Sequence, residues 1–415
     1  MGVEKELKKE VRVETGLRLG RTTPTRDEVK DAARQILEAK LKQKKISLEP
    51  LAREQLIDAI GDDLLGLGPI ESLMHDEAIT EIMINGPFKI YVEKDGKKLA
   101  TDKQFDDDGH LRTVLEKMLT SAGRRLDESL PYVDLSLENG ARVNAIIAPV
   151  AVGGATVTIR KFLDTLVSLD DLVRLETINN DMAEFLQAAI HAKLNILFSG
   201  ATGSGKTTTL GVLSTEIATD ERLIVIEDAL ELKLNQEHVV RLLTRNKNIE
   251  GKGEITIRQL FSNSLRMRPS RIILGEIRGE EALDYLQAMN SGHHGTLAVL
   301  HASTPVDAVG RLETMAMYAG LNLPLSEIRR QISSGLNLIL QHEQLADGSR
   351  KVTHVTELCG MKDGSIIFQD VFRYEIDSVS ENGKVAGQFR RINQPVSLER
   401  FRQRGVRWNE NTPPA

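Results

Sequence analysis

A glycine-rich segment, Gly200–Thr207 with the sequence GATGSGKT, constrains the fold of this chain more than any other feature. It matches the phosphate-binding loop pattern GxxxxGK[ST]. The apolar run Leu194–Phe198 precedes the segment, and apolar residues at helical spacing follow it. A strand should therefore enter the loop and a helix should leave it. This predicts an α/β domain with a phosphate site at the end of a strand.

The residues of this loop have distinct predicted roles. Its glycines let backbone N–H groups converge on phosphate oxygens, and the N-terminus of the following helix adds positive partial charge. Lys206 should reach the β- and γ-phosphates, and the Thr207 hydroxyl should ligate Mg²⁺. The predicted cofactors are therefore ATP and Mg²⁺. The other predicted nucleotide contacts in the loop are Thr202, Gly203, Ser204, Gly205 and Thr208.

Two further apolar runs, Arg271–Leu274 and Leu223–Ile226, are followed closely by the acids Glu276 and Glu227. The C-terminal ends of strands face the ligand crevice in open α/β sheets, so both carboxylates should face phosphate. We expect Glu276 to be the general base or to orient the attacking water. Glu227 is the second predicted catalytic acid and a Mg²⁺ ligand, partly through water. The alternative is that these acids cap the next helices.

Three of the nine histidines flank the apolar run Thr296–Leu300. His293 and His294 precede the run and His301 follows it, which should place all three near the γ-phosphate end of the sheet. His293 is predicted to be catalytic and His301 to contact nucleotide, as sensors that distinguish ATP from ADP. Structural hydrogen bonds are the alternative. Metal binding is not indicated, because no third ligand lies at a suitable spacing.

Two arginines, Arg142 and Arg160, lie in or beside predicted strands of a segment that has no evident catalytic carboxylate of its own. A planar guanidinium suits the stabilisation of negative charge on a transferring phosphoryl group. Taken alone, ordinary surface ion pairs explain these two residues better.

The length of 415 residues suggests two or three domains. A helical module should begin with a capping box at Thr25 and Glu28, after a largely polar and mobile arm that covers residues 1–23. The predicted divisions are the arm and helical module over 1–74, an α+β domain over 75–165, the phosphate-loop domain over 166–375, and a C-terminal extension over 376–415 whose end is disordered.

Composition excludes several classes of protein. A single cysteine, Cys359, excludes a disulfide framework and a Cys-rich zinc module and fits a reducing cytosol. The first ten residues lack the apolar core of a secretory signal, and no apolar run is long enough to span a membrane. We therefore expect a cytoplasmic protein with only peripheral membrane contact.

The net charge is −6, and the chain has one Trp and five Tyr, so neither a basic channel nor an aromatic stacking series indicates nucleic-acid binding. Residues 1–50 are different, because they hold 13 Lys or Arg against 9 Asp or Glu. This basic arm could bind acidic lipid or nucleic acid, or could be a solvated helix face rich in ion pairs.

Together, these motifs resemble the motor ATPases of the type II/type IV secretion superfamily and, more narrowly, the CpaF/TadA motors of tight-adherence (Tad) pili. Leu265–Pro269 and Asp62–Ile70 look typical of the CpaF branch. Four boxes appear in the order of the family: the phosphate loop 200–207, the aspartate box Ile226–Leu232, an atypical Walker B box Leu274–Gly279 and the histidine box Gly292–His301.

The resemblance implies a RecA-like ATPase domain preceded by a PAS-like α+β domain and a helical module. It also implies a homohexamer with ATP between the two domains, with Arg142 and Arg160 as arginine fingers and Arg278 as a nucleotide contact. Hydrolysis would drive an inner-membrane platform protein that inserts or removes pilin subunits, and a pilus-localisation partner is a further expectation.

The sequence departs from related motors at three points. It lacks their four-Cys zinc motif, Gly279 replaces the Asp that ends Walker B in other branches, and no retraction signature is evident around Leu325–Ser334. A type IV secretion or conjugation ATPase is the alternative function, since it would use the same active site. A nucleic-acid translocase and a nucleotide switch that scarcely hydrolyses are less consistent with the charge and with Glu276.

Overall fold

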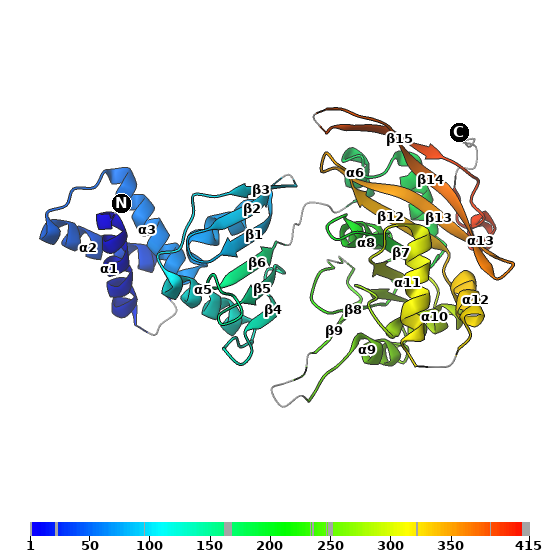
Figure 1. Cartoon of the computed structure of the whole chain (residues 1–415), viewed down its shortest axis with the longest axis horizontal. Helices are drawn as coiled ribbons and strands as arrows, with labels where there is room; N and C mark the ends of the chain where they lie inside the picture. The colour runs from blue at the N-terminus through cyan, green and yellow to red at the C-terminus, as the bar shows by residue number, and fades with distance from the viewer. Residues whose placement is uncertain are drawn as a thin grey trace. The chain divides into compact units, whose positions relative to one another are not determined.

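The computed structural model describes residues 2–20, 24–94, 96–161, 168–232, 234, 236–245, 247, 252–320, 323–381 and 383–408 (Figure 1). The chain divides into two compact units, Met1–Leu163 and Asp164–Ala415. Unit 1 therefore contains both the helical segment and the α+β segment. The division lies two residues from the predicted start of the phosphate-loop domain.

Unit 1 opens with three packed helices, α1 (Gly2–Leu19), α2 (Arg26–Lys44) and α3 (Pro50–Leu65). The capping box at Thr25 is confirmed, because Thr25 and Glu28 cap each other's backbone N–H groups. The core of the three helices is apolar and comes from all of them: Leu7, Val11, Ala33, Leu37, Ile57 and Ile60.

The predicted mobile arm is wrong, since most of it forms α1. Leu7 and Val11 lie four residues apart on one helix face and are fully buried. The two glycines that suggested mobility are compatible with this helix. A β-carbon at Gly16 would make an ordinary contact with Leu64 of α3, at 3.6 Å, and Gly20 adopts a positive φ of 66° where the helix ends.

The rest of unit 1 is an antiparallel sheet with a helix on one face. Its strand order is β3-β2-β1-β6-β5-β4, and every pairing is antiparallel. Buried residues of the strands and of α5 form one apolar core. The elements are η1 (Gly68–Ile70), α4 (Glu71–His75), β1 (Ile79–Asn85), β2 (Ile90–Lys94), β3 (Lys97–Ala100), α5 (Asp108–Ser121), β4 (Tyr132–Ser136), β5 (Arg142–Ile146) and β6 (Thr156–Arg160).

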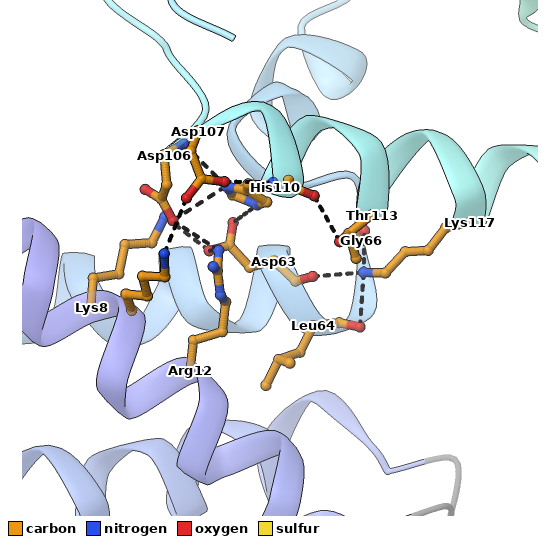
Figure 2. A network of polar contacts seen from close by, with 12 residues as sticks. Lys8, Arg12, Asp63, Leu64, Gly66, Asp106, Asp107, His110, Thr113 and Lys117 are labelled. Carbon is orange, nitrogen blue, oxygen red and sulfur yellow. Dashed lines mark hydrogen bonds and ion pairs between the residues drawn. The ribbon is translucent and has the colours of Figure 1, made fainter. Parts of the chain in front are cut away.

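A buried polar network joins α1, α3 and α5 (Figure 2). Asp63, whose side chain is 1% exposed, lies 2.9 Å from Lys8 Nζ, 3.1 Å from Arg12 Nη1 and 3.2 Å from His110 Nε2. Asp106 lies 2.9 Å from the same Arg12 nitrogen and 3.3 Å from His110 Nδ1. Two carboxylates thus meet two cations and an imidazole, so the charges compensate one another and hold α1 against the rest of the unit.

The segment after α3 is shaped by this network. Gly68 has a φ of 64°, and a β-carbon there would lie 3.2 Å from both Asp63 Oδ1 and His110 Nε2. Lys117 Nζ donates hydrogen bonds to the backbone oxygens of Asp63, Leu64 and Gly66, which are left unpaired at the end of α3. The Asp62–Ile70 motif therefore joins the helical module to the α+β fold.

Unit 2 contains a nine-stranded sheet with the order β15-β14-β13-β12-β7-β11-β10-β8-β9. From β15 to β12 in this order, neighbouring strands are antiparallel. From β12 to β9, neighbouring strands are parallel. The strands are β7 (Ile196–Gly200), β8 (Leu223–Glu227), β9 (Val239–Leu243), β10 (Arg271–Leu274), β11 (Leu297–Leu300), β12 (Leu338–Gln344), β13 (Arg350–Lys362), β14 (Ser365–Val379) and β15 (Val385–Arg391).

Helices cover both faces of this sheet, as the apolar strand runs predicted. Alternate residues of β7 enter different cores, with Ile196 and Phe198 on one face and Leu197 on the other. The first face is covered by α6 (Leu169–Arg174), α7 (Asn180–His191), α8 (Lys206–Ser214) and α13 (Leu398–Gln403). The second face is covered by α9 (Ile257–Ser264), α10 (Glu281–Asn290), α11 (Pro305–Met317) and α12 (Leu325–Gly335).

The C-terminal part of the chain belongs to this same sheet. The predicted boundary at residue 375 falls inside β14, and β15 and α13 follow it. Phe401 is buried against Phe185 of α7, and Trp408 packs edge-on against the same ring. Residues 376–408 are therefore not a separate extension, apart from residue 382, which the structure does not describe. The predicted disordered end over 409–415 lies outside the described residues.

Within the part of the chain that the structure describes, none of the helices combines the length and the apolar character that a membrane crossing requires.

Candidate active site

The phosphate loop lies where the sequence placed it, between the C-terminal end of β7 and the N-terminus of α8. Gly205 precedes the helix with a φ of 98°, which a residue with a β-carbon rarely adopts. At Gly200 a β-carbon would collide with the backbone oxygen of His342 and would approach Ser204 Oγ. The glycines thus allow the tight curve that such a loop needs to surround phosphate oxygens, so the loop fits a nucleotide.

Lys206 is buried in this loop and already oriented. Its Nζ donates a 2.6 Å hydrogen bond to the backbone oxygen of Ala201 and lies 3.4 Å from Nδ1 of His301. The loop therefore holds the ammonium group on its inner side, where a bound polyphosphate would neutralise it.

Glu276 lies between a histidine and an arginine. Its Oε2 accepts a 2.6 Å hydrogen bond from Arg278 Nη2, and its Oε1 lies 3.4 Å from His301 Nε2. Burial alone would raise the pKa of Glu276, but His301 and Arg278 outweigh it and lower the pKa to about 2. Glu276 is therefore anionic at neutral pH, and the ring of His301 connects it to Lys206.

Glu227, the last residue of β8, has the opposite environment. It is buried, and its Oε1 accepts hydrogen bonds from the N–H groups of Glu231 and Leu232, at 2.9 and 2.8 Å. Burial nevertheless raises the pKa of Glu227 to about 7. Its Oε2 lies 3.8 Å from Arg241 and accepts no hydrogen bond within the described residues. Two carboxylates with pKa values pushed in opposite directions are typical of catalytic sites.

In the Walker B box, Gly275 takes the place more often held by an aspartate, and the structure gives a steric reason for this glycine. A β-carbon at Gly275 would lie 2.9 Å from Cγ of Glu227. Side chains on the two strands would therefore compete for one space. Glycine at 275 leaves that space to Glu227, and the carboxylate of the Walker B box belongs to the next residue, Glu276.

Arg278 connects the aspartate box to the Walker B box. Its Nη1 lies 3.2 Å from Asp228 Oδ2, while Nη2 binds Glu276. Asp228 also accepts a 3.0 Å hydrogen bond from the Thr244 hydroxyl. Asp228 therefore belongs to the charged cluster at this edge of the sheet.

The histidines do not all lie where they were expected. β11 runs parallel to β7, and Leu300 pairs with Ser199, so His301 follows β11 at the end where the phosphate loop begins. His293 and His294 precede the opposite end of β11. Four residues of strand separate the two ends, about 13 Å. Within one subunit, His293 therefore does not meet Lys206 or Glu276, and of the three histidines only His301 reaches the phosphate end.

Arg142 and Arg160 lie in unit 1, directly opposite each other on the neighbouring strands β5 and β6. Glu81 of β1 is the next residue in the same row, with its Oε1 4.0 Å from Arg160 Nε. Val143 and Ile159 point the other way into the apolar core. The two arginines therefore lie on the sheet face that α5 does not cover.

One residue near the loop was not predicted. Arg350, the first residue of β13, donates a 2.8 Å hydrogen bond from Nε to the backbone oxygen of Gly203. It lies 147 residues from the loop in sequence. No local pattern could have identified it, because the contact exists only when the β12–β13 hairpin joins the sheet beside β7.

Residues 63–375 match the model of a family described as type II/IV secretion system protein. A putative conjugal transfer protein of Mycobacterium tuberculosis is 32% identical over 303 residues, which cover 71% of this chain and 85% of that protein. The type IV secretion system protein VirB11 of Bartonella henselae is 30% identical over 331 residues, which cover 70% of this chain and 92% of that protein.

The crystal structure of the pilus retraction motor PilT with bound ADP is 16% identical, with a TM-score of 0.50, and the match covers 81% of this chain and 86% of that one. At this identity the likeness concerns the fold. The family model spans all four boxes of the site and most of both units, and the chain therefore belongs to the type II/IV secretion system protein family.

Proposed function

We propose that this ATPase works as a hexameric motor that drives pilus assembly, or assembly and retraction, through a platform protein of the inner membrane. The observation that carries the proposal is the arrangement of Glu276, which is anionic, lies beside His301, and through it approaches Lys206 of the phosphate loop. A loop that only bound nucleotide would not need a partly buried carboxylate in this position.

Each residue has a defined task in this proposal. Lys206 and the backbone N–H groups of the loop bind the phosphates, and Glu276 orients the attacking water. His301 contacts both Lys206 and Glu276, so it is placed to respond when the terminal phosphate is present. The Thr207 hydroxyl and Glu227 would hold Mg²⁺, directly or through water, and the ion would neutralise charge on the phosphates.

The arginine pair supports an active site that is completed by a second subunit. Arg142 and Arg160 stand directly opposite each other on one face of the sheet, so one bound polyphosphate could meet both guanidinium groups. We therefore propose that these arginines act as fingers on ATP held by unit 2 in a ring of subunits.

This arrangement predicts a specific effect of Arg142→Ala. ATP turnover per subunit should rise with protein concentration as rings form, and the variant should lower kcat by about 10³-fold or more without changing oligomeric mass. Turnover is measured against concentration, with mass photometry in parallel. Arg112→Ala is the matched control, since Arg112 is an exposed arginine on α5 in the same unit. A rate that does not depend on protein concentration, or an Arg142→Ala variant as active as Arg112→Ala, would contradict the proposal that Arg142 is an arginine finger in a ring of subunits.

The choice of machine rests on different observations. The segments Asp62–Ile70 and Leu265–Pro269, and Gly279 in Walker B, favour the Tad branch of pilus motors. The relatives named for conjugal transfer and type IV secretion favour a second candidate, a motor for macromolecule export. Both candidates place the protein at the cytoplasmic side of an inner-membrane assembly.

The two candidates differ in the phenotype they predict. A clean deletion in the source cell, complemented with wild type or with Lys206→Ala, separates them. Loss of surface pili by electron microscopy, restored only by the wild type, is expected for a pilus motor. Normal piliation together with loss of plasmid transfer or of protein export would establish the second candidate.

A further inference from the structure

Unit 2 has a pocket of about 480 Å³ at the sheet edge opposite the phosphate loop. It lies where Leu194 and His294 lead into the N-terminal ends of β7 and β11. α13 forms another wall, with Arg400 on the helix and Arg404 just after it. The volume is typical of sites for small ligands. No residue of the proposed active site lines this pocket.

Among the described residues, no carboxylate forms an ion pair with either arginine. Arg400 is half-buried, and its guanidinium donates to Asn337 Oδ1 at 3.0 Å and to the backbone oxygen of Lys193 at 3.1 Å, both neutral acceptors. Like charges four residues apart on a helix repel each other, so the pair is unfavourable without an anion.

The acids that line the pocket already accept hydrogen bonds from other groups. Both oxygens of the buried Glu357 accept backbone hydrogen bonds, from Val396 at 2.6 Å and from Ser397 at 3.0 Å. Glu399 accepts a 3.2 Å hydrogen bond from Gln403. Within the described residues, these acids therefore form no ion pair with the guanidinium groups.

His294 adds a polar group to the lining of this pocket. Its Nδ1 is buried and has no hydrogen-bond partner among the described residues. Burial lowers the pKa of His294, and the charges of Arg400 and Arg404 lower it further. A neutral imidazole with an unused ring nitrogen can accept or donate a hydrogen bond to a ligand, depending on its tautomer.

We propose that this pocket binds a small phosphorylated molecule. Two guanidinium groups match the charge and the geometry of a phosphate, for which arginine is the preferred partner. The apolar side chains of Leu194, Leu358 and Val396 form a surface on which an organic part of the ligand can pack. An occupant would also touch the segment that leads into β7 and from there into the phosphate loop.

Pyrophosphate, AMP and inorganic phosphate are the probes for this site, and the binding of each is measured by isothermal titration calorimetry. The phosphate loop is excluded in two ways, by saturation of the wild type with Mg²⁺–ADP and by Lys206→Ala. Binding of one pyrophosphate per subunit should persist in both cases. AMP should bind more tightly than inorganic phosphate if the apolar wall contributes, and equally if only the charge matters.

Arg404→Gln should weaken pyrophosphate binding about tenfold or more, because it removes a charge-assisted contact. Within the described residues, the side chain of Arg404 makes no hydrogen bond or ion pair, and it is exposed, so this variant should fold normally. Arg402→Gln on the same helix, outside the pocket, is the control and should change affinity less than twofold. Absence of any binding beyond the phosphate loop, or equal losses in the two variants, would overturn the proposal. A change of oligomeric mass with Arg404→Gln would overturn it too, because the arginines would then meet a neighbouring subunit.

Discussion

Replacement of Glu276 by Gln is expected to reduce ATP turnover by about 10²- to 10⁴-fold while ATP binding remains. The amide has the same size but no charge, so it can no longer act as a proton acceptor or hold the attacking water as a carboxylate does. The contacts to His301 and Arg278 lose their ionic part, at 3.4 and 2.6 Å. Lys206 and the loop backbone do not depend on Glu276 for their geometry, so nucleotide affinity should change much less than kcat.

The measurement combines steady-state turnover with a titration of a fluorescent ATP analogue. Glu280→Gln is the matched control, because Glu280 lies four residues away and pairs with Arg258 at 2.8 Å, outside the site. The control should keep its turnover. If Glu276→Gln loses nucleotide binding to the same extent as turnover, the residue has a structural role. If its turnover is unchanged, the catalytic assignment is wrong.

The second large effect concerns stability. Asp63→Ala should lower the free energy of unfolding of unit 1 by about 3–5 kcal/mol, because it removes the buried counter-charge shared by Lys8, Arg12 and His110 and leaves Asp106 to face Arg12 and His110 alone. Asp62→Ala is the matched control. Asp62 is the neighbouring residue on α3, it forms a partly exposed ion pair with Arg26, and its loss should cost about 1 kcal/mol or less. Denaturant titration of the full chain, together with hydrogen exchange of α1 and α5, distinguishes the effects of the two variants.

The pH dependence of this network has two sides. Burial opposes the charge on Asp63, but His110 and Lys8 lower its pKa, so its contribution is present above the unfolded value and is lost as pH falls. His110 behaves in the opposite way. Burial alone would lower its pKa, but Asp106 and Asp63 raise it, and its contribution is lost as pH rises through that raised value. The wild type should therefore exceed Asp63→Ala in stability most clearly between about pH 4 and 6.5. A stability difference that does not vary with pH would show that these charges are not responsible.

Much of the fold followed from local pattern. The phosphate loop determined the strand before it and the helix after it, because GxxxxGKT needs a strand end and a helix N-terminus to form its phosphate site. The apolar runs that ended in Glu227 and Glu276 predicted parallel strands whose acids share one edge of the sheet. The capping box at Thr25 determined where α2 begins.

Other features depended on contacts between distant segments. Polar composition and two glycines suggested a mobile arm, yet α1 is stabilised by Leu7 and Val11 against α2 and α3 and by ion pairs to Asp63 and Asp106. A short-range pattern does not contain these partners. The same holds for β14 and β15, whose place in the sheet was decided by pairing with β13.

The residues of the candidate site divide in the same way, into those that local pattern predicts and those that only the fold brings together. The sequence by itself predicted the residues that we propose to carry the chemistry, since Lys206, Glu276 and Glu227 are identified by loop pattern and strand ends. Only the tertiary structure decided which of the others join them. Parallel pairing of β11 with β7 brings His301 to the phosphate end and leaves His293 at the other, and the β12–β13 hairpin brings Arg350 to the loop. The physical reason is that strand direction and strand neighbours are set by packing over the whole sheet, whereas a motif records only the chain on either side of it.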